Sequence, residues 1–199
     1  MRDCFSASIK RQGNRAQGAF PRKRQPPPDM TNTQLDHRAH RPTAAKHALC
    51  LLAHDVQRPA NVGSLFRLAD ALGVEKLFLT GRSCTPAHPK ARKAARTTEQ
   101  RVPFVHADDP LPIVAALKQA GYRIVSLEIS STSIDLAELA VAPGDRICLV
   151  LGNESAGVCQ PLLDASDATV HIPMYGENSS MNVASACAIA TYVIARKLG

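Results

Sequence analysis

Residues 172–195 read IPMYGENSSMNVASACAIATYVIA, and this stretch decides how the rest of the chain is organised. It begins with a short apolar strand end and passes through a polar, glycine-containing loop. It then enters a predicted helix that has no charged residue from Met181 to Ala195. The start of a helix presents free backbone N–H groups and the positive end of the helix dipole, which together suit a polar ligand. Ser180 is the expected cap of this helix, and Asn182 lies close by.

The predicted helix is apolar on nearly every side, because Val183, Cys187 and Ile189 do not fall on one stripe. A helix of this kind is usually buried from several directions. We therefore expect it to hold the preceding loop rigidly and to contact more than its own sheet.

The charge of the chain is unevenly placed along its 199 residues. The formal net charge is +7, and residues 1–46 hold ten Lys and Arg against three Asp and Glu. Residues 47–199 hold fourteen basic and fourteen acidic residues. The hydrophobic fraction of the whole chain is 45%, which suffices for a full core. We therefore predict a flexible basic arm over 1–46, which either binds nucleic acid or is simply solvated, and one folded domain over 47–199.

Several classes of protein are disfavoured by composition. No run of 18 or more uncharged apolar residues occurs, so no membrane span is expected. The first residues lack the apolar core of a secretory signal, and Pro26-Pro27-Pro28 argues against a helical transit peptide. The six cysteines form no C-x-x-C pair and have no histidines at zinc spacing, so no metal site is predicted. We expect a reducing compartment, the cytoplasm.

Apolar runs and helical periods alternate from residue 48 onward. The predicted strands cover 49–53, 76–80, 102–105, 122–127, 146–151 and 168–172, and the predicted helices cover 61–73, 110–120, 156–165 and 181–195. Such alternation is typical of an α/β fold with a mainly parallel sheet and helices on both faces. The polar stretch 81–101 holds six Lys and Arg against one Glu, and a short helix within it stays open.

Polar residues follow three of the predicted strands at their carboxyl ends, where ligands bind in open α/β sheets. The three segments are 61–67, 152–155 and 172–182. Each polar residue also has a purely structural explanation. Asn61 could cap a helix, and Arg67 could pair with Asp70. Gly152 could form an ordinary turn, and Glu154 could interact with the dipole of a helix start. Three polar ends on one sheet favour a shared ligand site over separate structural roles.

The same loops argue against several familiar enzyme classes. Only Gly63 occurs where a dinucleotide-binding enzyme needs G-x-G-x-x-G, and G-x-x-x-x-G-K-[ST] is absent as well. The G-x-S-x-G turn of serine hydrolases is also missing. The spacing therefore supports neither a dinucleotide oxidoreductase, nor a P-loop NTPase, nor a hydrolase of that type.

Together the three segments resemble the motifs of the SpoU/TrmH-like ribose 2′-O-methyltransferases of the SPOUT superfamily. The matching residues are Asn61-Val62-Gly63-Ser64-Leu65-Phe66-Arg67 with Ala69-Asp70 and Gly73, Leu151-Gly152-Asn153-Glu154 with Gly157, and Ile172-Pro173-Met174 followed by Ser180-Met181-Asn182-Val183. The resemblance covers residues 47–198, and the motifs have the right order and spacing. The chain departs from the family at Met181, where Leu is commoner, and at Ala184, where Ser is common.

The resemblance implies an α/β fold whose C-terminal part forms a deep trefoil knot, and an obligate homodimer with the site near its interface. It also implies S-adenosylmethionine as the cofactor and methyl transfer to a ribose 2′-hydroxyl of RNA, without a metal. The cofactor-binding residues that it implies are Leu127, Gly152, Ile172, Ser180 and Met181. The catalytic residues that it implies are Asn61, Arg67, Glu154, Ser180 and Asn182.

The resemblance leaves the RNA species open, with tRNA favoured over rRNA and a catalytically silent RNA-binding member as a third possibility. In this family Arg67 is held to promote deprotonation of the 2′-hydroxyl, yet a free guanidinium, with a pKa above about 12, is too weak a base. Our hypothesis is that Arg67 binds the adjacent phosphate and stabilises developing alkoxide charge. RNA affinity is expected from 1–46 and from the basic stretch 82–101 rather than from stacking, because only 4% of residues are aromatic.

Overall fold

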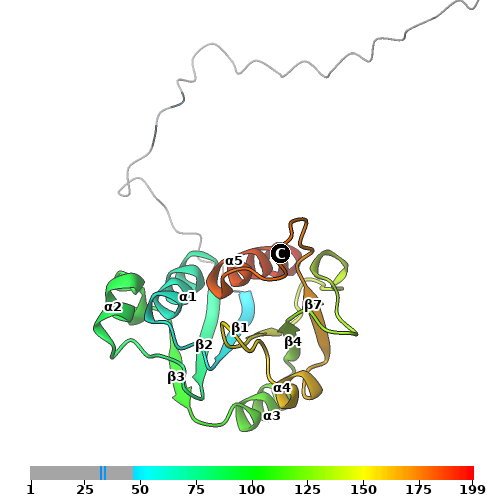
Figure 1. Ribbon diagram of the computed structural model, residues 1–199, viewed down its shortest axis with the longest axis horizontal. Helices are drawn as coiled ribbons and strands as arrows, with labels where there is room; N and C mark the ends of the chain where they lie inside the picture. The colour runs from blue at the N-terminus through cyan, green and yellow to red at the C-terminus, as the bar shows by residue number, and fades with distance from the viewer. Residues whose placement is uncertain (1–31, 33, 35–46) are drawn as a thin grey trace, which may run out of the picture. The chain divides into compact units, whose positions relative to one another are not determined.

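The computed structural model describes residues 32, 34 and 47–199. The predicted basic arm over 1–46 lies outside the described residues except for these two positions, so it remains a prediction. Within 47–199 the helices and strands alternate as the sequence predicts (Figure 1).

The described residues form a seven-stranded sheet in which every strand pair is parallel. The strands are β1 (His47–His54), β2 (Val74–Thr80), β3 (Phe104–Ala107), β4 (Arg123–Leu127), β5 (Ile134–Asp135), β6 (Ile147–Leu151) and β7 (Ala168–His171). Their order across the sheet is β3-β2-β1-β6-β4-β7-β5. The interior strand β1 is therefore flanked by β2, its neighbour in the chain, and by the central strand β6, which follows it by almost a hundred residues.

Helices cover both faces of this sheet. They are α1 (Pro59–Ala71), α2 (Pro89–Ala95), α3 (Leu111–Gln119), α4 (Gln160–Asp164) and α5 (Val183–Leu198), with short 3-10 helices η1 (Thr98–Gln100) and η2 (Leu136–Glu138). Figure 1 shows α1 and α5 on one side of the sheet and α3 and α4 on the other. The expected α/β fold, with a parallel sheet and helices on both faces, is confirmed.

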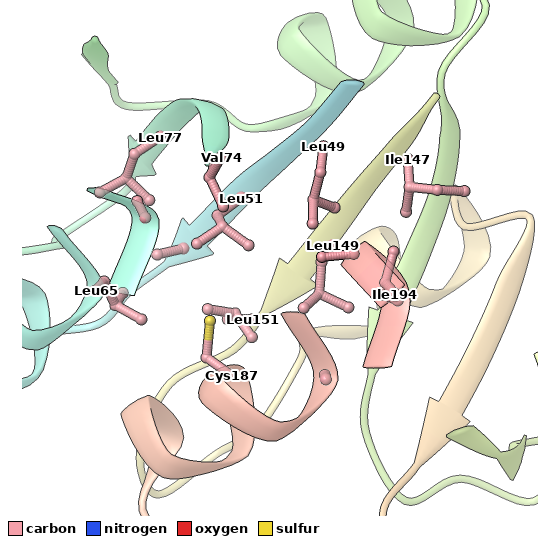
Figure 2. Close-up of a cluster of buried hydrophobic side chains, with 14 of the residues drawn as sticks. Leu49, Leu51, Leu65, Val74, Leu77, Ile147, Leu149, Leu151, Cys187 and Ile194 are labelled. Atoms are coloured by element: carbon pink, nitrogen blue, oxygen red, sulfur yellow. The ribbon is translucent and has the colours of Figure 1, made fainter. Parts of the chain in front are cut away.

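Alternate residues of β1 contribute to the two halves of the core, because successive side chains of a strand point to opposite faces. Leu49 and Leu51 pack in the core beneath α1 and α5, whereas Cys50 and Leu52 pack beneath α3 and α4. Figure 2 shows the first half, in which Cys187 of α5 lies close to Leu151 of β6. Strands buried on both faces explain the continuous apolar runs in the sequence.

Several predicted boundaries were wrong. Helix α1 begins at Pro59 rather than at Asn61, because proline is well tolerated in the first turn of a helix. Only Gln160–Asp164 of the predicted helix 156–165 is helical. The third strand is Phe104–Ala107 rather than 102–105, and the two-residue strand β5 was not predicted.

Helix α5 has one exposed stripe within the described residues, and the rest of it is buried or half-buried. Cys187, Ala190 and Ile194 are buried against the sheet, whereas the side chains of Ile189 and Tyr192 are 42% and 57% exposed. Contacts of α5 with α1 and η2 confirm that it touches more than its own sheet, whereas burial of the exposed stripe against a partner stays a prediction. The uncovered face carries an isoleucine and a tyrosine.

Candidate active site

The site is built where three parallel strands end. In a parallel sheet the carboxyl ends of neighbouring strands meet at one edge, and loops that follow them converge there. The chain leaves β1 through residues 55–58, leaves β6 through residues 152–159 and leaves β7 through residues 172–182. These loops lead into α1, α4 and α5, respectively.

Three side chains join these strand-to-helix loops, or corners, through a continuous chain of hydrogen bonds. The Asn61 side-chain amide donates to the Glu154 carboxylate at 2.9 Å. The Asn61 side-chain oxygen in turn accepts from the Asn182 amide at 3.0 Å. Asn61 is 7% exposed, and Arg58 rather than Asn61 holds the N-cap position of α1. Segments about a hundred residues apart are thus connected directly, and the cap interpretation of Asn61 was wrong.

The Glu154 carboxylate is surrounded by donors. Besides Asn61 it accepts hydrogen bonds from the backbone N–H groups of Arg58 at 3.0 Å and Gln57 at 3.3 Å. Partial burial alone would raise the pKa of Glu154, but the hydrogen bonds from the Asn61 side chain and the Arg58 amide outweigh it. The pKa of Glu154 therefore lies below its ordinary value, and the carboxylate is ionised at neutral pH.

Asn182 has a second role as the cap of α5. Its side-chain oxygen accepts from the N–H groups of Ala184 at 3.0 Å and Ser185 at 3.2 Å. The predicted cap, Ser180, lies two residues before this position in the exposed loop. The cap assignment to Ser180 was wrong, and the correct cap ties the start of α5 to the hydrogen-bonded chain through Asn61.

The loop after β6 is tightly closed. Asn153 and Gly157 form an isolated antiparallel bridge, and the Asn153 side chain accepts from the N–H groups of Ser155 and Ala156. A Cβ atom on Gly152 would lie 2.1 Å from the backbone of Gly157, so only glycine fits there. This closure occupies residues that were predicted to be helical, and it explains why α4 begins only at Gln160.

A pocket of about 520 Å³ opens between the loops that follow β4, β6 and β7. The structure places all of the predicted cofactor-binding residues in its wall: Leu127, Gly152, Ile172, Ser180 and Met181. Glu154 also lines it, as do the aliphatic residues Leu151 and Val183. Pockets of this volume and mixed lining suit a ligand of nucleoside size.

Arg67 lies outside this pocket. It is exposed on α1 and lines a separate hollow of about 390 Å³ together with Asn182 and Ser185. Asp70, its suggested partner, forms its ion pair with Arg101 at 3.6 Å instead. Within residues 47–199 Arg67 has no ion pair, so its guanidinium is available to a ligand. Asn182 lines the hollow of Arg67 and donates a hydrogen bond to Asn61, which in turn donates to Glu154.

Two residues that the sequence reasoning did not single out also belong to the site. Glu128 follows β4 directly and lines the larger pocket. Asn153 donates to the carbonyl oxygen of Asp55 at 2.8 Å and so holds the loop after β1 against the loop after β6. The position of Glu128, one residue beyond a predicted strand end, was a signal that could have identified it.

Two further observations concern the described residues alone. Among them, no three His, Cys, Asp or Glu side chains gather in a way that could hold a metal ion. None of their helices is long and apolar enough to span a membrane.

Known proteins share this architecture. The chain is 30% identical over 142 residues to the 23S rRNA (guanosine(2553)-2′-O)-methyltransferase RlmP of Bacillus subtilis, which covers 71% of this chain and 56% of that protein. The chain thus spans little more than half the length of this relative.

Two solved structures give the same picture. The SpoU methyltransferase AviRb of Streptomyces viridochromogenes, in complex with AdoMet, superposes with a TM-score of 0.68 at 28% identity, over 77% of this chain and 62% of that one. A structure described for 2-OH methylation of C/U34 on tRNA superposes with a TM-score of 0.68 at 29% identity, over 76% of this chain and 97% of that one. Residues 48–192 match the model of the SpoU rRNA Methylase family, and the chain belongs to that family.

Proposed function

We propose that this chain transfers a methyl group from S-adenosylmethionine to a ribose 2′-hydroxyl of structured RNA. The observation that carries the proposal is the chain of hydrogen bonds from Glu154 through Asn61 to Asn182. It brings the three motif-bearing corners together beside the pocket that the predicted cofactor residues line. The 2′-O-methyltransferase named among its relatives supports the same chemistry.

The residues of the larger pocket fit the cofactor. Leu127, Ile172 and Met181 supply apolar surface for an adenine ring, and Gly152 lines the same pocket at the closed loop after β6. When bound, S-adenosylmethionine supplies a methyl group already activated on a sulfonium, so the protein needs chiefly to orient the ribose and manage one proton.

The five polar residues divide into two roles. Arg67 faces the second hollow with its guanidinium unpaired among residues 47–199, and it binds the phosphate next to the target ribose and stabilises alkoxide charge. Ser180, exposed at the pocket rim, contacts the bound molecules. The side chains of Glu154, Asn61 and Asn182 bond mainly to one another and to backbone amides. Their role is therefore to position the three strand-to-helix corners.

A basic surface on α2, which packs against the helix that carries Arg67, suits the RNA backbone. Helix α2 packs on α1 through small residues, since a Cβ on Gly63 would lie 2.4 Å from the Cβ of Ala94. This packing leaves Lys90, Arg92 and Lys93 exposed on a domain whose acidic and basic residues balance. We assign these exposed side chains of α2 to salt-sensitive phosphate contacts.

Charge reversal tests this surface. The double variant Lys90→Glu with Lys93→Glu should weaken RNA binding at least tenfold and flatten its salt dependence, while calorimetric binding of S-adenosylmethionine stays unchanged. The matched control is Lys118→Glu with Lys197→Glu, because these lysines bond to Asp167 and to the carbonyl oxygens of Ala137 and Leu139. Equal RNA affinity of both double variants would remove α2 from the RNA site.

The proposed substrate is tRNA, with rRNA as the second candidate. The relative linked to methylation of position 34 on tRNA is spanned to 97% by this chain, whereas the 23S rRNA enzyme is spanned to 56%. A catalytically silent member is disfavoured because all of the implied polar residues are present, with Glu154 and Ser180 at the larger pocket and Arg67 and Asn182 at the second hollow. Cytoplasmic location also stays a prediction.

We propose in addition that two copies pair through the uncovered face of α5. Ile189 and Tyr192 are exposed there, and this face continues into the hollow that holds Arg67 through Ala184 and Ala188. The variant Ile189→Lys with Tyr192→Lys should sediment as a monomer when the wild-type chain sediments as a dimer. Leu111→Lys, at an exposed leucine of α3, is the control that should leave the dimer intact.

The C-terminal trefoil knot is the last part of the proposal. Its support is membership of the SpoU family, with which the strand order is compatible. Pulling the chain from both ends in optical tweezers should yield an extended length shorter than about 3.3–3.6 Å per residue, because a tightened knot retains residues. Extension to the full contour length would exclude the knot.

The decisive experiment is transfer of labelled methyl groups from S-adenosylmethionine to total RNA, followed by nucleoside analysis. We expect label in 2′-O-methylated nucleosides of the tRNA fraction and none with the Arg67→Ala variant. Label in rRNA alone would select the second candidate. Binding of the cofactor and RNA without any transfer would select the silent alternative.

A further inference from the structure

Glu128 occupies a defined place in the larger pocket. It follows β4 directly, and its backbone N–H donates to the carbonyl oxygen of Val170 in β7 at 2.9 Å. Strand β4 lies between β6 and β7, so Glu128 stands between the two loops that form most of the pocket wall.

The carboxylate of Glu128 is held but not saturated. One oxygen accepts from the N–H of Val158 at 2.8 Å, and the other accepts from the N–H of Ile129 at 2.9 Å. A carboxylate has about four acceptor positions, so about two remain for a ligand. Glu154, the other carboxylate of the pocket, already accepts from three N–H donors.

The loop after β6 is shaped around this carboxylate. Gly157 has a φ of +69°, and a Cβ atom there would lie 2.2 Å from the Oε2 atom of Glu128. Any side chain at position 157 would therefore displace the carboxylate from the pocket. The glycine of the second motif and the glutamate after β4 fit each other.

Within the described chain, the remaining acceptor positions of Glu128 are not filled by an ion pair and are open to donors of a ligand. The described residues that line this pocket include no Lys or Arg, and Glu128 forms no ion pair within residues 47–199. A vicinal diol offers two hydroxyl donors at the spacing of a carboxylate. In doubly wound nucleotide-binding folds, an acidic residue after the strand next to the glycine-containing loop binds the ribose in this way. Glu128 stands after β4, next to the glycine-containing loop of β6.

We propose that Glu128 is a cofactor-binding residue whose carboxylate accepts hydrogen bonds from the ribose hydroxyls of S-adenosylmethionine. The inference rests on the proposed function, because it takes the pocket to be the cofactor site. It adds a residue that none of the three motifs contains.

Calorimetric titration of the full chain with S-adenosylmethionine and S-adenosylhomocysteine tests the inference. Glu128→Gln should weaken both ligands by about 10- to 100-fold and to the same extent, because both carry the ribose and only one carries a positive sulfonium. Glu138→Gln removes an equal charge from an exposed residue outside the pocket and should change neither affinity. Unchanged binding to Glu128→Gln would overturn the inference, as would a loss confined to S-adenosylmethionine.

A second measurement does not depend on how well the variant folds. The 2′-deoxy and 3′-deoxy forms of S-adenosylhomocysteine should bind the wild-type chain at least tenfold more weakly than the parent compound. They should bind Glu128→Gln about as well as the parent compound does. Full affinity of both deoxy forms for the wild-type chain would overturn the inference. If the wild-type chain binds neither cofactor form, the proposed function itself fails.

Discussion

The amino and carboxyl edges of the sheet, where the strands begin and end, carry similar polar groups with different roles. At the amino edge, the Tyr122 hydroxyl donates to the Glu75 carboxylate and accepts from the Arg146 guanidinium, which also lies 4.3 Å over the Tyr122 ring. At the carboxyl edge, Glu154, Asn61 and Asn182 form a similar chain but border two hollows. A polar cluster supports the fold when its partners are all internal, and it can serve a ligand when empty space adjoins it.

The electrostatics of the edges differ in the same sense. Burial, reinforced by the hydrogen bond to Glu75, raises the pKa of Tyr122, so its hydroxyl keeps its proton and remains a donor. At the carboxyl edge, hydrogen bonds lower the pKa of Glu154, so an ionised acceptor orders the loops around the site. The comparison predicts that substitutions at the carboxyl edge impair function, whereas those at the amino edge affect stability alone.

The largest effect is expected for Arg67→Lys. Lysine keeps the charge but lacks the rigid fork of donors, so turnover should fall about 100-fold while the Kd for RNA changes little. Single-turnover methylation and equilibrium RNA binding measure the two quantities. Arg101→Lys, at the arginine that pairs with Asp70, is the matched control and should retain full turnover. Unchanged turnover of Arg67→Lys would refute the role of Arg67.

Asn61→Ala should combine both kinds of effect. The substitution removes the link between Glu154 and Asn182 and leaves buried groups unpaired, so the free energy of unfolding should fall by about 2 kcal/mol. Turnover should fall as well, because the loop after β6 and the start of α5 are no longer held in fixed positions relative to α1. Urea denaturation and methylation assays test this. Gln160→Ala, which removes only an exposed side-chain hydrogen bond to Asp164, should change neither.

Tyr122→Phe probes the opposite edge. It deletes the hydroxyl that joins Glu75 to Arg146, and we expect a loss of about 1 kcal/mol in the free energy of unfolding. Turnover at saturating cofactor and RNA should stay within about twofold of the wild type, as expected for an internally satisfied cluster. A large loss of turnover in a folded variant would break the distinction between the edges.

The smallest effect concerns Glu154 and pH. Its pKa in the folded chain lies below the unfolded value of about 4.3, so the ionised carboxylate stabilises the fold above that pH and loses this effect as the pH falls through the folded pKa. The difference in unfolding free energy between wild type and Glu154→Gln should be constant from about pH 5 to 8 and shrink below about pH 4. Solvent screening keeps it below about 1 kcal/mol. A difference that grows on acidification would contradict the sign.

Much of the fold could be predicted because parallel strands buried on both faces leave plain apolar runs. Strands β1, β2, β4 and β6 fall within a few residues of their predicted positions. Strand β5 could not be found, since Ile134–Asp135 has no periodicity and is defined only by its pairing with β7. The strand order also depends on contacts between distant segments, which no local pattern contains.

The site residues were proposed from motifs, whereas their contacts depended on tertiary structure. Helix propensity suggested Asn61 and Ser180 as caps, but Asn61 turns to Glu154 and Asn182 takes the capping role. The local rule that pairs Arg67 with Asp70 failed because Arg101, from the segment after α2, competes for Asp70. The errors at Asn61 and Asp70 replaced a long-range contact by a nearby one in the sequence, whereas the error at Ser180 misplaced a local cap by two residues.

The insertion of β6 beside β1 has a consequence for how the protein is made. Leu49 pairs with Ile147 and Ala53 with Leu151. The pairing of β1 with β6 therefore cannot form until nearly a hundred further residues have left the ribosome. Until then β1 presents an unpaired apolar edge, which is the kind of surface that aggregates or recruits chaperones. We expect slow refolding in vitro and a nascent chain that depends on chaperones until the last strands emerge.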